Sequence, residues 1–129
     1  MEQTSGFIRA EKEMADHLDN GAVGLHWVSA DGIILWANRA DYEPLGYTRE
    51  EWVGHHAAEF HADHAALGDM FQRLSKGETI YNYPARVRHK NGSIQNVLIA
   101  SSVLFDDAGH FVHTRCFTVL APVSDGKER

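Results

Sequence analysis

Cysteine, proline and long apolar runs are all scarce in this sequence. The 129 residues include one cysteine, Cys116, so the chain cannot form an internal disulfide, and isolated thiols are typical of reducing compartments. The N-terminus is acidic and polar, and no apolar run approaches the ~20 residues that a membrane-spanning helix requires. We therefore expect a cytoplasmic protein without a signal peptide or a membrane insertion.

Positive charge is scarce as well. The chain has 12 Lys and Arg against 18 Asp and Glu, a net charge of -6 at pH 7. Nucleic-acid binding depends on clustered basic residues, so we expect no nucleic-acid partner. One basic cluster, Arg86, Arg88 and Lys90, alternates along an expected strand and is interpreted as its solvated face, with an acidic partner as the alternative.

The length and the 43% apolar content fit one domain with a core of its own. Residues 5–19 have the spacing of an amphipathic helix that Asn20-Gly21 would end. We divide the chain into a helical cap or dimerisation segment (1–21), a folded domain (22–121) and a flexible tail or linker (122–129). Pro122 discourages a helix directly after the domain.

The stretch from Asp31 to Gly54 carries the clearest local signals. Asp31-Gly32 favours a tight turn between expected strands at Val23–Val28 and Ile33–Ala37. Further along, Thr48 and Glu51 have the spacing of a capping box. Tyr47 and Trp52 flank that cap as a hydrophobic staple, so a helix is predicted to begin after Thr48.

A longer helix is predicted from Asp63 to Lys76. Asp63 is its expected N-cap and Gly77 its expected end. Its apolar positions recur at helical spacing, at Leu67, Met70, Phe71 and Leu74.

Three strands follow, separated by turns at Asn91-Gly92 and Asp107-Ala108-Gly109. In the first strand, Tyr81, Tyr83, Ala85 and Val87 alternate with polar residues and proline. The strand from Ile94 to Phe105 is apolar on both alternating faces, so both should be covered. Helices can cover one face of this strand. We expect the N-terminal helix or a second subunit to cover the other face, and we predict that this face supports a homodimer.

The order of elements and four segments, DGIILWANRA, LGYTREEWVG, FQRLSKGE and RVRHKNGS, resemble the PAS domain family of the S-box type over about residues 22–120. The chain is similar to PAS domains of bacterial sensor histidine kinases. The resemblance implies an α+β PAS fold: a five-stranded antiparallel sheet in the order 2-1-5-4-3, with short helices enclosing a pocket against one face.

Two functions stay open. The first is a signal-sensing domain of a bacterial signal-transduction protein, such as a sensor histidine kinase, that binds an unidentified small ligand and modulates an effector domain or partner through dimer packing. The second is a ligand-free interaction and dimerisation module. Catalysis is not expected, because nucleophile-elbow, phosphate-loop and HExxH motifs are missing and Asp41 and Glu43 fall in a helical, solvated stretch. Any kinase activity would lie outside this chain.

Two cofactors of the family are tested by position. Photosensory members carry a flavin-reactive Cys where this chain reads GHHAAEFHAD, and Cys116 lies instead on the last strand as an expected small buried thiol, so flavin is not expected. In haem-binding members the ligand histidine would fall near Ala66, whereas His64 and His61 come two and five positions earlier. A haem gas sensor is a third hypothesis that a shifted helix start would permit.

Four histidines cluster around the start of the long helix. His61 and His64 could share a helical face as metal ligands, but no Cys or paired carboxylate accompanies them or the preceding His55 and His56. We interpret them as surface and capping residues, with a protonation switch as the alternative.

The candidate pocket residues come from three parts of the chain. Arg115 could meet an anion, although exposure on the outer face or pairing with an internal acid is the plainer interpretation. Asn38 and Ser102 could supply hydrogen bonds, and Asn38 could instead cap the following turn. The apolar candidates could equally fill the core. The full set is Trp36, Asn38, Phe60, Leu67, Phe71, Ser102 and Arg115.

Overall fold

The computed structural model describes residue 9, residues 12–13 and residues 16–121. Within the helix predicted over 5–19, the described residues are helical, and residues 16–20 lead toward the first strand. The remainder of that prediction, and the predicted tail over 122–129, lie outside the described residues. No helix in this described part of the chain combines the length and apolar character that crossing a bilayer requires.

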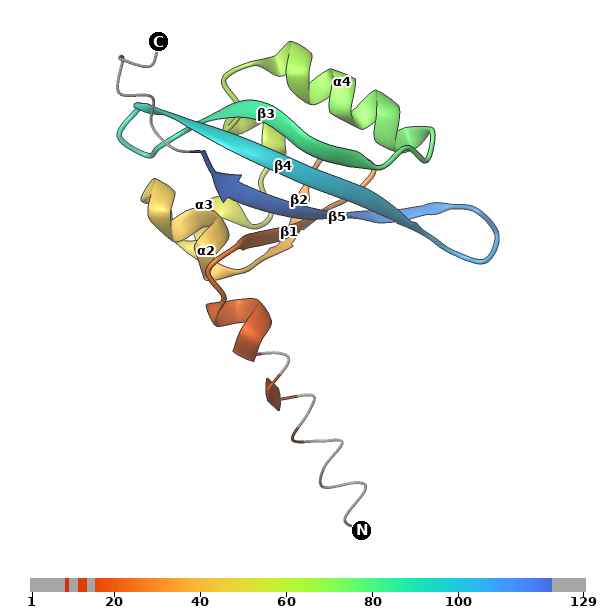
Figure 1. Ribbon diagram of the computed structural model, residues 1–129, viewed down its shortest axis with the longest axis horizontal. Coiled ribbons are helices and arrows are strands. Elements are labelled where there is room, and N and C mark those ends of the chain that lie inside the picture. Colours follow the sequence, from red (N-terminus) through yellow and green to blue (C-terminus); the bar gives the residue numbers. More distant parts are fainter. Residues whose placement is uncertain (1–8, 10–11, 14–15, 122–129) are drawn as a thin grey trace.

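The chain then runs through two strands, several short helical segments, one longer helix and three strands (Figure 1). Their bounds are β1 Gly24–Val28, β2 Ile34–Ala37, α2 Arg39–Tyr42, a 3-10 turn Glu43–Leu45, α3 Arg49–Trp52, a 3-10 turn Ala57–Glu59, α4 His64–Ser75, β3 Ile80–Arg88, β4 Ile94–Phe105 and β5 Phe111–Leu120.

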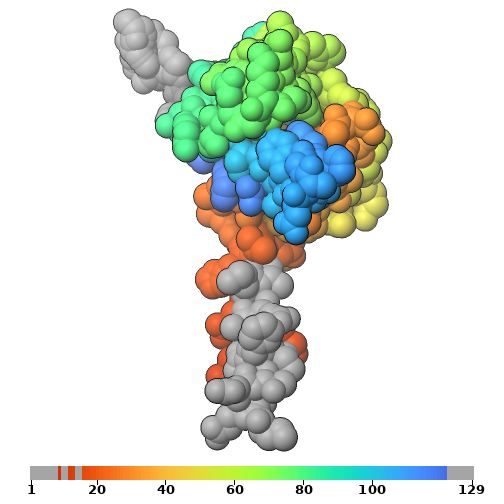
Figure 2. Space-filling model, turned by 90° about the vertical axis from the view of Figure 1, so that its right-hand side faces the viewer, coloured from red at the N-terminus to blue at the C-terminus, as the bar shows by residue number. Residues whose placement is uncertain are grey.

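All neighbouring strands are antiparallel, and their order is β2-β1-β5-β4-β3. This confirms the predicted fold class. The α4 helix packs against β3 and β4, while α2 and α3 contact β1 and β2. The hairpin between β4 and β5 extends beyond the rest of the sheet in Figure 1 and faces the viewer in Figure 2.

The core lies between the helices and one face of the sheet, which we call the inner face. The opposite face is the outer face. Buried side chains of both layers form one cluster, in which the sheet contributes Val28, Ile34, Val97 and Ile99 and the helical segments contribute Leu45, Trp52, Leu67, Met70 and Leu74.

The local signals near α3 are confirmed. The Thr48 hydroxyl accepts a hydrogen bond from the Glu51 backbone at 3.3 Å, and the Thr48 backbone donates one to the Glu51 carboxylate at 2.9 Å. The Tyr47 and Trp52 rings pack with centroids 5.2 Å apart. The turn at Gly32 has a φ of 88°, a conformation that glycine adopts without strain.

The start of α4 differs in one detail. Asp63 is the N-cap, but its side chain makes no capping bond. It instead accepts two hydrogen bonds from the Arg86 guanidinium, at 2.8 and 2.7 Å. Arg86 is exposed, and so is Lys90, which pairs with Glu51 at 2.5 Å. The basic cluster therefore lies on a solvated face, as expected.

A bulge in β3 breaks the strand alternation that the sequence suggested. In β3, Ile80 pairs with Ser101 and Tyr83 with Ile99, so an irregularity at Asn82 separates them. As a result Ile80 is buried, while Tyr81 is 76% exposed. The predicted alternation that grouped Tyr81 with the inward residues of this strand is wrong at that residue.

The outer face stays apolar and open within the described residues. Alternation places Leu98, Ala100 and Leu104 of β4 on it, opposite the buried Val97 and Ile99. Trp27, Phe117 and Val119 extend this surface and are 40%, 52% and 51% exposed. The expectation that both faces of β4 are covered is not met by the described part of this single chain.

Candidate functional site

Two adjoining cavities of about 30 Å³ each lie between the inner face and the helices. Both are lined by His26, Ala57, His61 and Ile99. Since a water needs roughly 10–15 Å³ of such space, each cavity has room for one or two molecules of that size. The first cavity continues along α4 and β5, and the second continues toward Trp52 and Phe60.

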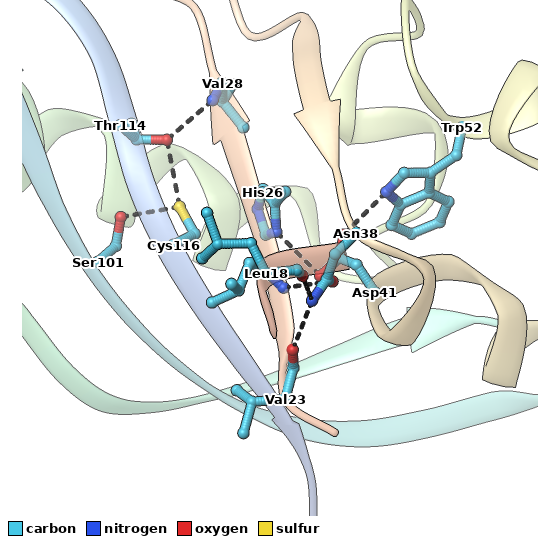
Figure 3. A network of polar contacts seen from close by, with 11 residues as sticks. Leu18, Val23, His26, Val28, Asn38, Asp41, Trp52, Ser101, Thr114 and Cys116 are labelled. Carbon is cyan, nitrogen blue, oxygen red and sulfur yellow. Dashed lines mark hydrogen bonds and ion pairs between the residues drawn. The ribbon is translucent and has the colours of Figure 1, made fainter. Parts of the chain in front are cut away.

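His26 reaches this space from β1 because strand alternation turns it to the inner face with Val28. Its Nδ1 lies 3.1 Å from Oδ1 of Asp41 (Figure 3). Oδ2 of Asp41 accepts a hydrogen bond from Trp52 Nε1 at 2.9 Å. Gly24 permits this close approach of α2 to β1, since a Cβ there would lie 2.8 Å from Asp41 Oδ1.

Asp41 corrects an expectation from the sequence. Only 2% of its side chain is exposed, so it does not belong to a solvated stretch. The buried carboxylate also changes the pKa of His26. Burial by itself would lower the pKa of His26, but Asp41, together with Cys116, raises that pKa well above its usual value. The shift favours the protonated form of His26, which pairs with the buried Asp41 carboxylate.

Cys116 is the cross-strand partner of both His26 on β1 and Ser101 on β4. Its Sγ lies 2.9 Å from the Ser101 hydroxyl and 3.2 Å from the Thr114 hydroxyl, which also accepts a hydrogen bond from the Val28 backbone at 3.0 Å (Figure 3). Burial raises the pKa of the Cys116 thiol, but His26 and the two hydroxyls outweigh it, so the net shift is downward. The sequence-based prediction of a small buried thiol at Cys116 is therefore confirmed, and the surroundings of the thiol are polar.

His61 lies opposite these groups, ahead of α4, where it forms an isolated bridge with Val87. It is 9% exposed, and its Nδ1 has no hydrogen-bond partner among the described residues. Burial, reinforced by the charges of His26 and His64, lowers the pKa of His61 to about 4. A neutral imidazole with a free ring nitrogen therefore lines both cavities.

The sequence candidates divide between the two faces of the sheet. Leu67 and Phe71 line the first cavity, and Phe60 lines the second. Ser102 and Arg115 do not, because they pair with each other on the outer face, where Arg115 donates to the Val103 carbonyl at 3.3 Å.

Trp36 also lies on the outer face, contrary to its expected place in the pocket. Trp27 pairs with Trp36, but Val28 pairs with Ile34, so Leu35 is an extra residue in β2. This bulge turns Trp36 away from the side that Ile34 occupies. Its ring packs against the ring of Trp27, with centroids 5.2 Å apart.

Asn38 is fully buried but joins chain segments instead of facing the cavity. Its amide donates to the Leu18 carbonyl at 2.7 Å and the Val23 carbonyl at 2.9 Å, and its oxygen accepts from the Leu25 backbone at 2.8 Å. It precedes α2 without a side-chain capping bond. Asn38 thus ties the helical residues before β1 to the sheet.

Sequence reasoning missed His26, Asp41, Ser101 and Thr114. Alternation could have identified three of them, because each shares a strand face with buried neighbours. Asp41 carried no such signal, since it lies in a helix of four residues and its burial depends on α2 packing against β1.

The remaining histidines do not assemble a metal site. Within the described residues, no three His, Cys, Asp or Glu side chains gather in a way that could hold a metal ion. His64 Nε2 lies 3.0 Å from the Ala58 carbonyl, His56 Nδ1 accepts from the Ala58 backbone, and His55 pairs with Glu59. Cavities of about 30 Å³, with His64 directed at a carbonyl, do not fit a haem in this packing.

Comparisons with known proteins agree with this geometry. A family model described as PAS domain matches residues 21–119. The PAS domain of an HTR-like protein from Haloarcula marismortui superposes with a TM-score of 0.77 at 16% identity, covering 93% of this chain and 98% of that one.

A second solved structure is a domain of a sensory box sensor histidine kinase/response regulator from Geobacter sulfurreducens. It gives a TM-score of 0.69 at 19% identity, covering 87% of this chain and 94% of that one. At these identities, the structural likeness supports the fold. No curated protein sequence matches the chain.

Proposed function

The chain belongs to the PAS domain family of signal-sensing domains, and from this premise we propose that it binds a small polar ligand between its sheet and its helices. The observation that carries this proposal is the buried Nδ1 of His61, which has no hydrogen-bond partner among the described residues, on a side chain that lines both cavities together with His26. Leaving a buried polar atom without a partner costs about 1–3 kcal/mol, and a bound polar molecule would remove that cost.

The size of the cavities limits the ligand. About 30 Å³ in each holds a molecule of a few heavy atoms unless α4 moves away from the sheet. Apolar side chains, among them Leu67 and Phe71 of α4, supply most of the wall. The polar groups therefore set the orientation of the ligand and the apolar wall excludes bulk water.

The output of the domain is proposed to be a change in dimer packing. The outer face, with Trp27, Phe117 and Val119 exposed, fits a second copy of this chain. Beside it, an open groove of about 530 Å³ runs between residues 16–20 and the Trp27–Trp36 pair. β1 and β5 carry the cavity on one face and this surface on the other, so ligand binding could alter both together.

The effector is proposed to be a histidine kinase or a related signalling protein. The support is the resemblance in sequence to PAS domains of such kinases and the Geobacter sulfurreducens neighbour that carries that description. The kinase chemistry would reside in another domain or partner.

A ligand-free interaction module is the second candidate, because the cavities are small and most of the core is filled with side chains. Native mass spectrometry of the purified protein separates the two. A bound small mass supports the sensor, whereas a mass equal to the chain alone in a tight dimer supports the interaction module. A visible absorption spectrum tests haem independently, since a Soret band would require a repacked pocket.

A further inference from the structure

His26 and Cys116 face each other across β1 and β5 at the wall of the first cavity. Asp41 holds the Nδ1 side of the His26 ring at 3.1 Å, and Nε2 is the ring nitrogen that Asp41 does not engage. This order of carboxylate, imidazole and thiol is an arrangement that turns a thiol into a thiolate nucleophile. The buried ion pair with Asp41 keeps the proton on the imidazole.

Two hydroxyls complete the surroundings of the sulfur. The Ser101 hydroxyl lies 2.9 Å from Cys116 Sγ and the Thr114 hydroxyl lies 3.2 Å from it. The thiol donates to the Thr114 hydroxyl, and once the sulfur is deprotonated both hydroxyls can donate to it and stabilise the anion. The pKa of Cys116 is lowered in spite of its burial. The α4 side of the cavity contributes only apolar side chains, so His26 and His61 are the titratable groups that face the thiol.

The cavity selects the reaction partner by size and polarity. Its volume of about 30 Å³ admits a molecule little larger than water and excludes bulky electrophiles. His61 Nδ1, which has no partner among the described residues, can hydrogen-bond a hydroxyl placed there. A small uncharged hydroperoxide, hydrogen peroxide itself, meets both conditions.

We propose that Cys116 is a modification site for hydrogen peroxide, with His26 and Asp41 activating the thiol and His61 holding the peroxide. The Cys116 sulfur attacks one peroxide oxygen, so an S–O bond forms as the O–O bond breaks. Sulfur loses two electrons and the peroxide gains them. The departing hydroxide takes the Nε2 proton of His26 and leaves as water.

The product is a sulfenic acid on β5. The chain has no second cysteine, so the sulfenic acid cannot form an internal disulfide and awaits an external thiol. The proposed reactivity of Cys116 is argued from the geometry of the site alone. The proposal that oxidation of Cys116 acts as a signal rests on the sensing function proposed above. Oxidation would add one oxygen atom to a packed cavity wall, next to the strand pair that also carries the outer face.

The decisive experiment compares the fully reduced wild-type protein folded in buffer and unfolded in urea. Each is treated with hydrogen peroxide at about pH 6, where an ordinary thiol is almost entirely protonated. Dimedone added on unfolding traps the sulfenic acid, and intact mass gives the rate. We expect the folded protein to react on the order of 10 times faster than the unfolded one. An equal or slower rate in the folded protein overturns the proposal.

Matched variants test the activating role. His26→Gln should slow the reaction of folded protein on the order of 10-fold, whereas His113→Gln, on the outer face against Trp27, should leave it unchanged. A folded His26→Gln protein with the wild-type rate would remove His26 from the proposal. The comparison of folded with unfolded wild type remains decisive if His26→Gln does not fold.

Two controls distinguish oxidation of Cys116 from oxidation of Met70 and from a change in assembly. Met70 lines the same cavity and can also gain an oxygen, but its sulfoxide neither reacts with dimedone nor reverts with dithiothreitol. An oxygen found on Met70 alone overturns the proposal. Native mass spectrometry of the same samples measures the fraction of dimer. Oxidation of Cys116 with no change in that fraction supports the modification site and counts against the proposed sensing function.

Discussion

Nδ1 of His26 lies 3.1 Å from Oδ1 of Asp41, and 2% of the Asp41 side chain is exposed. This contact joins β1 to α2 and sets a positive charge beside a buried thiol. Buried ion pairs add little stability relative to apolar residues, but removing one partner is costly because the other charge remains. Substitution of either residue is therefore the most direct test of the site.

Asp41→Asn should lower the free energy of unfolding by about 3 kcal/mol at neutral pH, since it leaves the partly buried His26 without its counter-charge. Urea denaturation measures this change. Asp31→Asn, at an exposed turn position where either residue is favoured, is the matched control and should stay within about 0.5 kcal/mol. Equal effects of the two substitutions would contradict the buried pair.

The same pair predicts a dependence on alkaline pH. The pKa of His26 is higher in the folded protein, so its contribution to stability is complete below the unfolded value of about 6.5. It is lost as the pH rises through the folded pKa. Wild type should therefore lose stability over this range, and Asp41→Asn should show a smaller loss.

His61 predicts an opposite trend in acid. Its pKa of about 4 in the folded protein lies below the unfolded value. Between these two pH values the unfolded chain therefore binds a proton that the folded chain does not bind. Stability should fall as the pH drops from about 6.5 to about 4, by an amount on the order of 3 kcal/mol from this group. His61→Phe should flatten that part of the curve. An unchanged slope in this variant would place the acid sensitivity elsewhere.

Trp52→Phe tests the second bond to Asp41. Phenylalanine can keep the stacking on Phe60, whose ring centroid lies 4.2 Å away, but loses the Nε1 donor. A carboxylate oxygen deprived of its partner should cost about 2 kcal/mol in the free energy of unfolding. Trp36→Phe, on the outer face, is the same substitution and should cost less than about 1 kcal/mol. Similar losses in both would indicate that ring volume matters more than the hydrogen bond.

Phe117→Glu tests the proposed dimer. Phe117 is 52% exposed at the middle of the outer face, and a carboxylate there should weaken self-association by at least about 10-fold without unfolding the domain. Sedimentation velocity at several concentrations gives the dissociation constant. Tyr81→Glu, at a residue that is 76% exposed but lies on the β3 bulge, should associate like wild type. A monomeric wild type, or a Phe117→Glu protein that still dimerises fully, would rule this surface out.

Local patterns were enough to predict the scaffold. The Thr48 capping box, the Tyr47 staple, the turn at Gly32 and the spacing of α4 each involve residues within a few positions of one another. Such signals depend on backbone geometry and on the chain nearby. Together they led to the element order, and through it to the sheet order and the family.

The site depended on contacts that no local pattern contains. A single inserted residue, Leu35, moved Trp36 to the other face of the sheet. Asp41 became buried because α2 packs on Gly24, and Cys116 met His26 because β5 lies beside β1, 90 positions along the chain. Periodicity and capping act over one or two turns of chain and so determine the elements. Which polar side chains share a buried space depends on strand register and helix docking, and these arise only when the whole chain packs.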